Sequence, residues 1–427
     1  MKILIKILIV FYCLSTLSFF RPFDSIPDEL AKMMSYASMF MIFALSIMTK
    51  TKTNPTKRFA PQIWLLIMFI GISCFMPLFA YVDQSFMQTV VATIPFFSYA
   101  LYLAIRKFDI DRNFLYGLIF SIATLATIAH LINHITFPVI TFGITPEEVD
   151  SERGGLRLVI IGFNYIALAF FIAVGEWART HKFWWWIPII VFAVAIFSSY
   201  TRQHILVCSI VGLWTLLGNI GIIKRVVILA TCTVLLLYAI PKIPIFNQMM
   251  DLTVEQYEQN EYTTKENVRI TAAKYYGYEN FESFANRLFG NGVPSFHSNW
   301  GKDFDTHAEM EGVHAYDVGW IGMNWFFGIF AVLCMFSISL SIIFKPQKSS
   351  LSFISGYFIW LLITGFSCGS PIYPYEIMVT VLAISLTETG VSIIKRRKHQ
   401  EPVTAQWGEQ FHWERIQAQI QRQQQKQ

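Results

Sequence analysis

The stretch GVHAYDVGWIG, residues 312–322, separates the two kinds of segment in this sequence. Before it lies a polar segment that runs from Pro241 to Asp317, and after it begins an apolar run that continues to residue 344. A membrane-spanning α-helix needs about 20 mainly apolar residues, and this run is long enough. Long connections between such helices are usually functional, so we look first for chemistry at the polar segment.

The composition extends this interpretation to the whole chain. Apolar residues make up 54% of the sequence, charged residues only 14%, and the net charge is +5. A soluble domain carries about 25% charged residues, which excludes an ordinary soluble fold. We therefore predict an all-α, polytopic membrane protein with about twelve spans. They fall at about 3–20, 31–49, 61–81, 86–105, 114–137, 156–177, 183–200, 203–221, 226–241, 318–344, 351–369 and 373–394.

This count divides the chain into four regions. Residues 1–241 hold the first nine predicted spans, 242–317 form one large external loop with amphipathic helices, 318–394 hold the last three spans, and 395–427 form a polar tail. The first span is interpreted as a retained helix, because no small-residue cleavage site follows it. Within the loop, residues 267–288 have the pattern of one amphipathic helix lying on the membrane face.

Charge alternates between successive connections and predicts the orientation. One set of connections is rich in Lys and Arg, as in Lys395–Lys398, and the other set is acidic or mixed, as in Glu147–Glu152. Cytoplasmic loops of membrane proteins carry the excess of basic residues. Both termini are therefore expected in the cytoplasm and the 242–317 loop outside it.

The positions of the cysteines and histidines in the sequence indicate neither a metal site nor disulfide bonds. All six cysteines fall inside or at the ends of apolar stretches, where they serve as small apolar residues. The histidines are scattered without the spacing of metal ligands. We expect neither a bound metal nor a cofactor.

Basic residues are uncommon on the external side of membrane proteins, and four of the arginines predicted to lie there are candidates for a site. Arg153 and Arg157 precede the sixth span, Arg202 lies in a short turn between the seventh and eighth, and Arg269 lies in the loop. Each of them could simply reach the lipid headgroups. Together they suit an anion site, because the forked guanidinium group binds phosphate in a bidentate geometry.

Two further residues of the 312–322 stretch are candidates for proton transfer. His314 titrates near neutral pH and can accept a proton from a hydroxyl group. Asp317, three residues later, can share a helical face with it or act as the base itself. The structural alternative for Asp317 is an N-cap of the following helix, and a purely structural role for His314 is equally open.

The order of these features resembles the bacterial O-antigen polymerase and O-antigen ligase superfamily. The resemblance is strongest between residues 153 and 330, and the predicted span layout extends it to the whole chain. Members often have His-Asn where this chain has His314-Ala315, which leaves the base open between His314 and Asp317. The matching pieces, in chain order, are Arg153-Gly-Gly-Leu-Arg157, Gly162-Phe-Asn164, Ser-Tyr-Thr-Arg202-Gln, Val-Arg269, Gly290-Asn-Gly292, His314 and Gly319-Trp-Ile-Gly322.

The resemblance implies a metal-independent, inverting glycosyl transfer on the outer face of the bacterial inner membrane. The donor would be a glycan on undecaprenyl pyrophosphate and the acceptor another glycan. Arg202 and Arg269 would stabilise the leaving pyrophosphate, with help from Arg153 and Arg157, and His314 or Asp317 would take the acceptor proton. Expected partners are membrane lipids, a chain-length regulator and a flippase, with no nucleic acid.

Two other functions compete with polymerisation of repeat units. A ligase would use the same donor but would transfer the glycan to a lipid A core or a protein. A flippase or other transporter predicts charged residues deep inside the spans and discontinuous helices. Most spans lack ionisable residues at mid-depth in the sequence, which disfavours a transporter. Polymerase is favoured over ligase, because the ligase-like His-Asn pattern is incomplete and the polar insert is modest in size.

Overall fold

The computed structural model describes residues 1–17, 28–50, 58–80, 82–142, 162–199, 201–217, 268–344, 352–369 and 371–388, with a few isolated positions between 223 and 234. Arg153 and Arg157, the predicted ninth span, the first part of the loop up to residue 267 and the 395–427 tail lie outside these residues. The side chain of Arg202 lies outside them as well.

The regular structure of the described residues is entirely helical, which confirms the predicted all-α class. Local sequence signals set many helix ends, as at α7, where the Asp111 carboxylate accepts from the Phe114 N–H at 2.9 Å. The helices are α1 (Lys2–Thr16), α2 (Asp28–Met48), α3 (Ala60–Ser73), α4 (Met76–Phe79), α5 (Phe86–Thr93), η2 (Ile94–Ala100), α6 (Leu101–Lys107), α7 (Arg112–Thr136), α8 (Phe163–Thr180), η4 (Phe183–Trp185), α9 (Trp186–Ser198), α10 (Arg202–Leu216), α13 (Val268–Lys274), η7 (Tyr275–Glu279), α14 (Phe284–Phe289), α15 (Asn299–Glu311), η8 (Ala315–Val318), α16 (Gly319–Phe344), α17 (Ser352–Thr364) and a last helix over 374–388.

Among the described residues, five stretches are long and apolar enough to cross a membrane. They are Leu30–Met48, Ala60–Phe79, Phe86–Lys107, Arg112–Thr136 and Ala315–Phe344. Each overlaps a predicted span, as do the shorter apolar helices Phe183–Ser198, Gln203–Leu216 and Phe353–Thr364. The structure thus supports a membrane protein, whereas the count of twelve and the orientation stay predictions.

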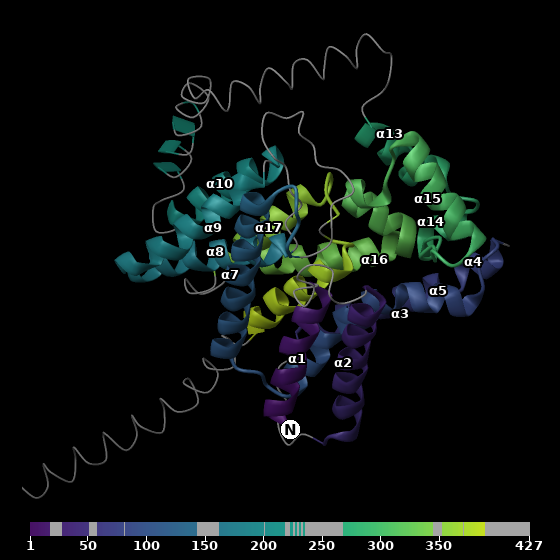
Figure 1. The fold of residues 1–427 in the computed structure, drawn as a ribbon, viewed down its shortest axis with the longest axis horizontal. Helices are drawn as coiled ribbons and strands as arrows, with labels where there is room; N and C mark the ends of the chain where they lie inside the picture. Colours follow the sequence, from purple (N-terminus) through teal and green to yellow (C-terminus); the bar gives the residue numbers. More distant parts are fainter. Residues whose placement is uncertain are drawn as a thin grey trace, which may run out of the picture.

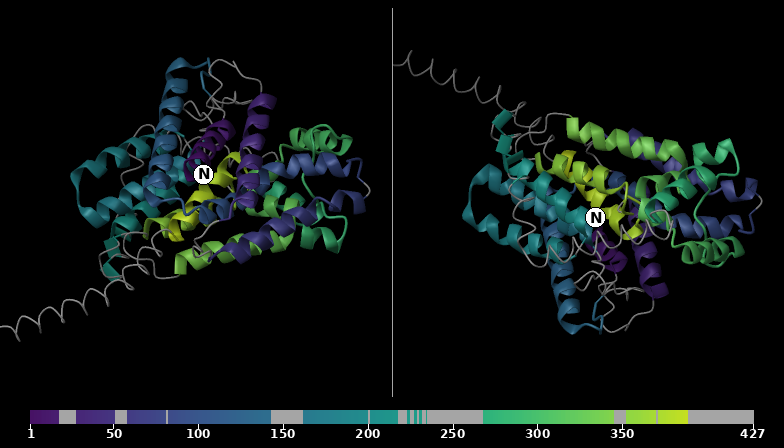
Figure 2. Two further views of the ribbon diagram at one scale, coloured as in Figure 1. Left: turned by 90° about the horizontal axis from the view of Figure 1, so that it is seen from below. Right: turned by 90° about the horizontal axis from the view of Figure 1, so that it is seen from above.

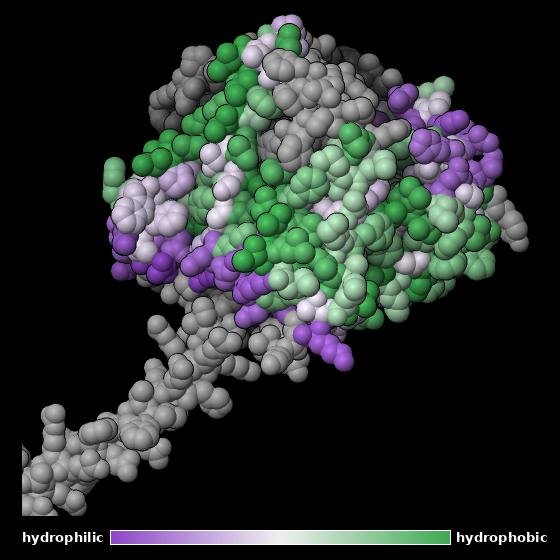
Figure 3. Space-filling model, turned by 60° about the horizontal axis from the view of Figure 1, so that its bottom comes forward, coloured by the Kyte–Doolittle hydropathy of each residue, from purple (hydrophilic) through white to green (hydrophobic). Residues whose placement is uncertain are grey.

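The surface has the character expected of such a protein. Large apolar side chains are exposed on several of these helices, including Ile47, Trp64 and Phe183, which are 83%, 60% and 82% exposed. Figure 3 shows apolar side chains over much of one face, with hydrophilic ones gathered toward its edges. Apolar side chains on this scale face lipid rather than water in a membrane protein.

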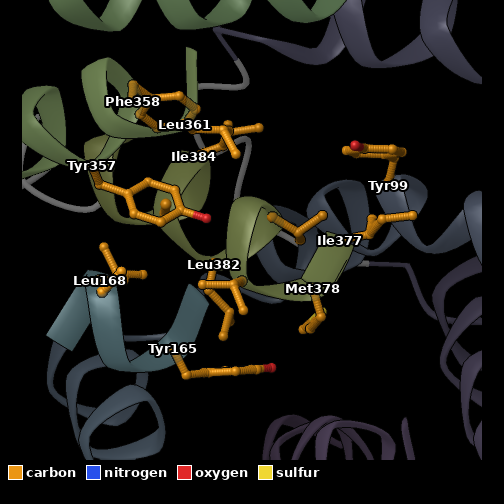
Figure 4. Packing of buried hydrophobic residues seen from close by; sticks show 14 of the residues in the cluster. Tyr99, Tyr165, Leu168, Tyr357, Phe358, Leu361, Ile377, Met378, Leu382 and Ile384 are labelled. Atoms are coloured by element: carbon orange, nitrogen blue, oxygen red, sulfur yellow. The ribbon is translucent and has the colours of Figure 1, made fainter. Parts of the chain in front are cut away.

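The 374–388 helix is the centre of the bundle. Every residue from 376 to 388 is buried, so this helix is surrounded on all sides. In Figure 4, Ile377, Met378 and Leu382 of this helix lie in one buried cluster with Tyr165 of α8 and Tyr357 of α17. Figure 1 places the α8–α10 group to one side of this centre and α13–α15 to the other.

One buried ion pair ties the far end of this helix to its neighbours. Arg106 Nε lies 2.9 Å from Glu388 Oε2, and the two side chains are 0% and 3% exposed. Tyr102 donates to Glu388 Oε1 at 2.5 Å, and the backbone N–H of Phe59 donates to the same oxygen at 3.2 Å. The sequence pattern places Arg106 in a basic cytoplasmic connection and gives no sign of this pairing, whereas both side chains lie well inside the protein.

The long helix α16 is broken near its middle. Gly328 has φ 80° and ψ 168°, so the helical hydrogen-bond pattern is interrupted there. The carbonyl groups of Trp325 and Phe326 instead accept from the N–H groups of Asn291 and Gly292, at 2.7 and 3.0 Å. A break inside a membrane-spanning helix is tolerated where other protein groups satisfy the backbone in this way. Figure 2 shows α16 lying alongside α3, which it contacts extensively.

Two glycines make this close backbone contact possible. A Cβ atom at Gly290, where φ is 84°, would lie 2.3 Å from the Phe326 carbonyl oxygen. A Cβ atom at Gly328 would lie 2.1 Å from the Leu288 carbonyl oxygen. Residues other than glycine rarely adopt such a positive φ, and moving the neighbouring backbone atoms aside would cost free energy. The Gly-Asn-Gly turn at 290–292 is therefore part of the packing of α16.

We expect Gly290→Ala and Gly328→Ala each to destabilise the protein by about 3 kcal/mol, from strain at positive φ and overpacking. Gly117→Ala on α7 is the matched control, because a Cβ atom there meets nothing within 4 Å. Thermal unfolding of the purified protein in detergent measures the difference. Equal melting temperatures for all three variants would contradict this packing.

The buried ion pair makes a second prediction. Arg106→Leu leaves Glu388 buried without its cation and should cost about 3–5 kcal/mol. Adding Glu388→Leu to that variant removes the stranded charge and should restore much of the loss. A double variant less stable than Arg106→Leu alone would show that the two side chains act independently of each other.

Candidate functional site

The helix that carries Arg269 packs on the segment that carries His314. Arg269 is exposed on α13, and α13 continues into the π-helical turn η7, whose Tyr276 is fully buried. The Tyr276 hydroxyl donates to the Val313 carbonyl at 3.1 Å, and α13 also contacts η8 directly. The predicted single helix over 267–288 is thus three short pieces, α13, η7 and α14, and the first two hold Arg269 beside the 312–318 segment.

An aromatic cluster fixes this arrangement on the start of α16. The ring of Trp325 lies 5.4 Å from that of Tyr276 and 5.0 Å from that of Phe304 on α15. Trp325 also donates through Nε1 to the Asn280 carbonyl at 2.9 Å. Aromatic rings bury large areas, and such pairs add about 0.5–1.5 kcal/mol each beyond that area. The 268–311 segment is therefore packed on α16, and it positions the residues between α15 and α16.

His314 and Asp317 lie in the short turn between α15 and α16. Helix α15 ends at Gly312 in the left-handed conformation, and η8 follows with His314 at its N-cap position. His314 is exposed, and its carbonyl accepts from the Asp317 N–H at 3.0 Å. Asp317 lies inside η8, and α16 starts at Gly319.

The N-terminus of α10, where Arg202 stands, meets the same region from the other side. Gln203 Nε2 donates to the Ile363 carbonyl at 3.4 Å, and its Oε1 accepts from the Ser367 hydroxyl. The Trp320 N–H donates to the Gly365 carbonyl at 2.7 Å. The first turn of α10 and the first turn of α16 are thus bound to one turn, residues 363–369.

These contacts form two groups. The helix with Arg269 packs on the turn with His314 and Asp317. The first turn of α10, next to Arg202, and the first turn of α16 are attached to residues 363–367. Asp317 also faces the phenols of Tyr276 and Tyr373, and the Tyr373 ring stacks on Tyr316 with centroids 5.1 Å apart. Where the Arg202 guanidinium points lies outside the described residues, as do Arg153 and Arg157.

The sequence analysis missed one acidic residue of this region. Asp305 on α15 is half-buried, and its burial raises the pKa of its carboxyl group, as does Glu309 one turn later. His314 acts in the opposite direction and lowers that pKa. The i,i+4 spacing of Asp305 and Glu309 was visible in the sequence, but their place next to His314 depends on the Gly312 turn.

A cavity of 640 Å³ lies elsewhere, between the end of α3, α4 and α14. Its walls are mainly apolar, with Ile72, Met76, Phe79 and Phe289 among them, and Glu282, Ser283 and Asn286 stand on its α14 side. Of the predicted site residues whose side chains the structure describes, Arg269, His314 and Asp317, none lines this cavity. Over the described residues, no group of three or more His, Cys, Asp or Glu side chains is arranged to hold a metal ion.

The Asp305 carboxyl group gives a pH prediction with a definite sign. Its folded-state pKa is raised, so the stability it contributes is present at low pH and is lost as pH rises through that pKa. In acid, Asp305→Asn should therefore melt at the same temperature as the wild type. Near neutral pH, it should melt at a higher temperature than the wild type. Asp303→Asn, at an exposed position of the same helix, is the control. A wild type that melts higher than Asp305→Asn at neutral pH would contradict the assignment.

No protein-family model matches this sequence, and no curated protein matches it at a significant level.

Proposed function

We propose that this protein is a membrane glycosyltransferase that polymerises glycan repeat units carried on undecaprenyl pyrophosphate. The donor glycan is transferred to an acceptor glycan on the outer face of the bacterial inner membrane, without a metal ion. Two observations support the proposal: α13 packs on η8, and the first turns of α10 and α16 are both hydrogen-bonded to residues 363–369. These are the elements on which the candidate anion-binding and proton-accepting residues stand.

The proposed reaction uses these residues in two roles. The acceptor hydroxyl oxygen attacks the anomeric carbon, and the bond from this carbon to the pyrophosphate oxygen breaks with inversion. The pyrophosphate leaves with the bonding electron pair, and Arg202 and Arg269, with Arg153 and Arg157, stabilise its charge. The hydroxyl proton passes to His314 or Asp317. His314 is exposed and Asp317 is half-buried, so His314 is more open to an incoming acceptor.

A ligase would use the same donor chemistry with a lipid A core or a protein as acceptor. A strain that lacks this protein separates the two activities. Loss of a polymerase should leave single repeat units on the cell surface, whereas loss of a ligase should leave full-length glycan on the lipid carrier. Surface glycan of normal length and amount in that strain would speak against both.

Specific observations also favour a transporter as the second candidate. Helix α16 is discontinuous at Gly328, and Arg106, Glu388 and Glu376 are buried inside the bundle. Discontinuous helices and buried charges are common in transporters, where they surround ion and substrate sites. Purified protein in vesicles with a labelled lipid-linked glycan distinguishes the two, because a transferase lengthens the glycan whereas a transporter moves it unchanged across the bilayer.

Arg269 provides the most direct mutational test of the anion site. Arg269→Ala should lower the rate of glycan transfer by about 100-fold or more, the usual cost of removing one group that stabilises transition-state charge. The measurement is the rate of chain elongation by purified protein with a lipid-linked repeat unit.

Arg287→Ala is the matched control. Arg287 is exposed on α14 in the same external segment, and its substitution removes the same charge. It should keep the wild-type rate within a few-fold. Equal rates for Arg269→Ala and the wild type would remove Arg269 from the site. An equal loss in both variants would point to a general effect of external charge.

A further inference from the structure

Three glutamates are buried at the helices of the bundle, and two of them have cationic partners. Glu388 pairs with Arg106 at 2.9 Å, and Glu176 lies 3.5 Å from Arg112 and also contacts Arg179. A buried carboxylate needs such a partner, because removing its charge from water costs several kcal/mol. These two pairs show how the fold accommodates a buried charge.

Glu376 has no such partner among the side chains that the structure describes. It is 3% exposed and stands in the first turn of the 374–388 helix. Its carboxyl group accepts from the backbone N–H groups of Phe163 and Asn164, at the N-terminus of α8. Among the described residues, its Oε2 atom has no hydrogen-bond partner. One oxygen is thus bound at a helix end while the other is buried and unsatisfied.

The groups that face Glu376 cannot neutralise its charge. They are phenols from three elements: Tyr165 of α8, Tyr357 of α17, and Tyr373 and Tyr375 of its own segment. Phenols titrate near pH 10 and are neutral in physiological conditions. From α10, His204 approaches this end of α8 by packing on the Phe163 ring, with centroids 4.4 Å apart.

Other buried polar atoms at the same end of the bundle also lack hydrogen-bond partners among the described residues. Asn164 Nδ2 and Trp360 Nε1 are buried without hydrogen-bond partners, and the Trp360 ring lies 5.5 Å from that of His204. Unsatisfied buried polar atoms are few in native proteins and call for an explanation. Here an acceptor, two donors and no cation among the described side chains occur together at the N-termini of two helices.

We propose that Glu376 is a buried proton-binding site, whose carboxyl group carries a proton in the resting protein and releases it when this end of α8 opens to water. Burial without a cation favours the neutral acid. The two N–H donors and the positive end of α8 favour the carboxylate. Because no described cation offsets its burial, the neutral acid is the favoured form of this carboxyl group. The site does not depend on the proposed glycosyl transfer.

Infrared spectroscopy of the full-length protein in lipid nanodiscs tests the site directly. The wild type should have a carbonyl band of a buried, protonated carboxyl group at neutral pH, and this band should disappear at alkaline pH. Glu376→Gln should lack the band. Glu388→Gln, which changes the ion-paired glutamate of the same helix, should keep it. A wild type without the band, or Glu376→Gln with the band intact, would overturn the proposal.

A measurement on the wild type alone covers the case in which Glu376→Gln does not fold. A hydrophobic carbodiimide reacts with protonated carboxyl groups in apolar surroundings, and peptide mass spectrometry locates the product. We expect labelling at Glu376 that becomes faster as pH falls, and no labelling at Glu388. Absence of label at Glu376 across the pH range, or equal labelling of both glutamates, would contradict a proton-binding role.

Discussion

The break in α16 at Gly328 is the constraint on which the rest of the structure depends. A helix inside a membrane cannot leave carbonyl groups unsatisfied, and here the N–H groups of Asn291 and Gly292 supply the missing partners. This contact fastens α14 and the 290–292 turn to the membrane helices. Through the aromatic cluster at Trp325 it also fixes α13, η7 and α15. The positions of Arg269 and His314 are consequences of this one backbone contact.

The 374–388 helix complements that contact from the opposite side of the site. It is buried all round, and it has a glutamate near each end. Glu388 is ion-paired with Arg106, accepts from Tyr102 and from the Phe59 N–H, and connects this helix to α6 and the start of α3. Glu376 faces the N-terminus of α8 without a cation among the described side chains. One end of the helix thus holds an ion pair, whereas the other end holds a buried carboxyl group with no described cation beside it.

Much of the helical layout could be predicted from the sequence, because long apolar runs such as Arg112–Thr136 contain their own signal. The shape of the 268–311 segment could not be predicted in this way. Its pattern resembled one amphipathic helix, but the π-helical turn at Tyr275–Glu279 and the contact at Gly290 reshape it. The nearness of Arg269 to the His314 turn was expected from the family resemblance, and its cause, the Tyr276 hydrogen bond to Val313, was not. The burial of Arg106, Glu388 and Glu376 was not predicted, because pairing between distant helices leaves no local pattern.

The central claim is that Arg202 and Arg269 serve one anion site. The most direct measurement is cross-linking between cysteines placed at 202 and 269, in a protein whose six native cysteines have been replaced. With a short bifunctional maleimide, our account predicts an intramolecular cross-link that undecaprenyl pyrophosphate suppresses when added beforehand. If no cross-link forms although both cysteines react singly with the reagent, the two positions belong to separate environments, and the account is wrong.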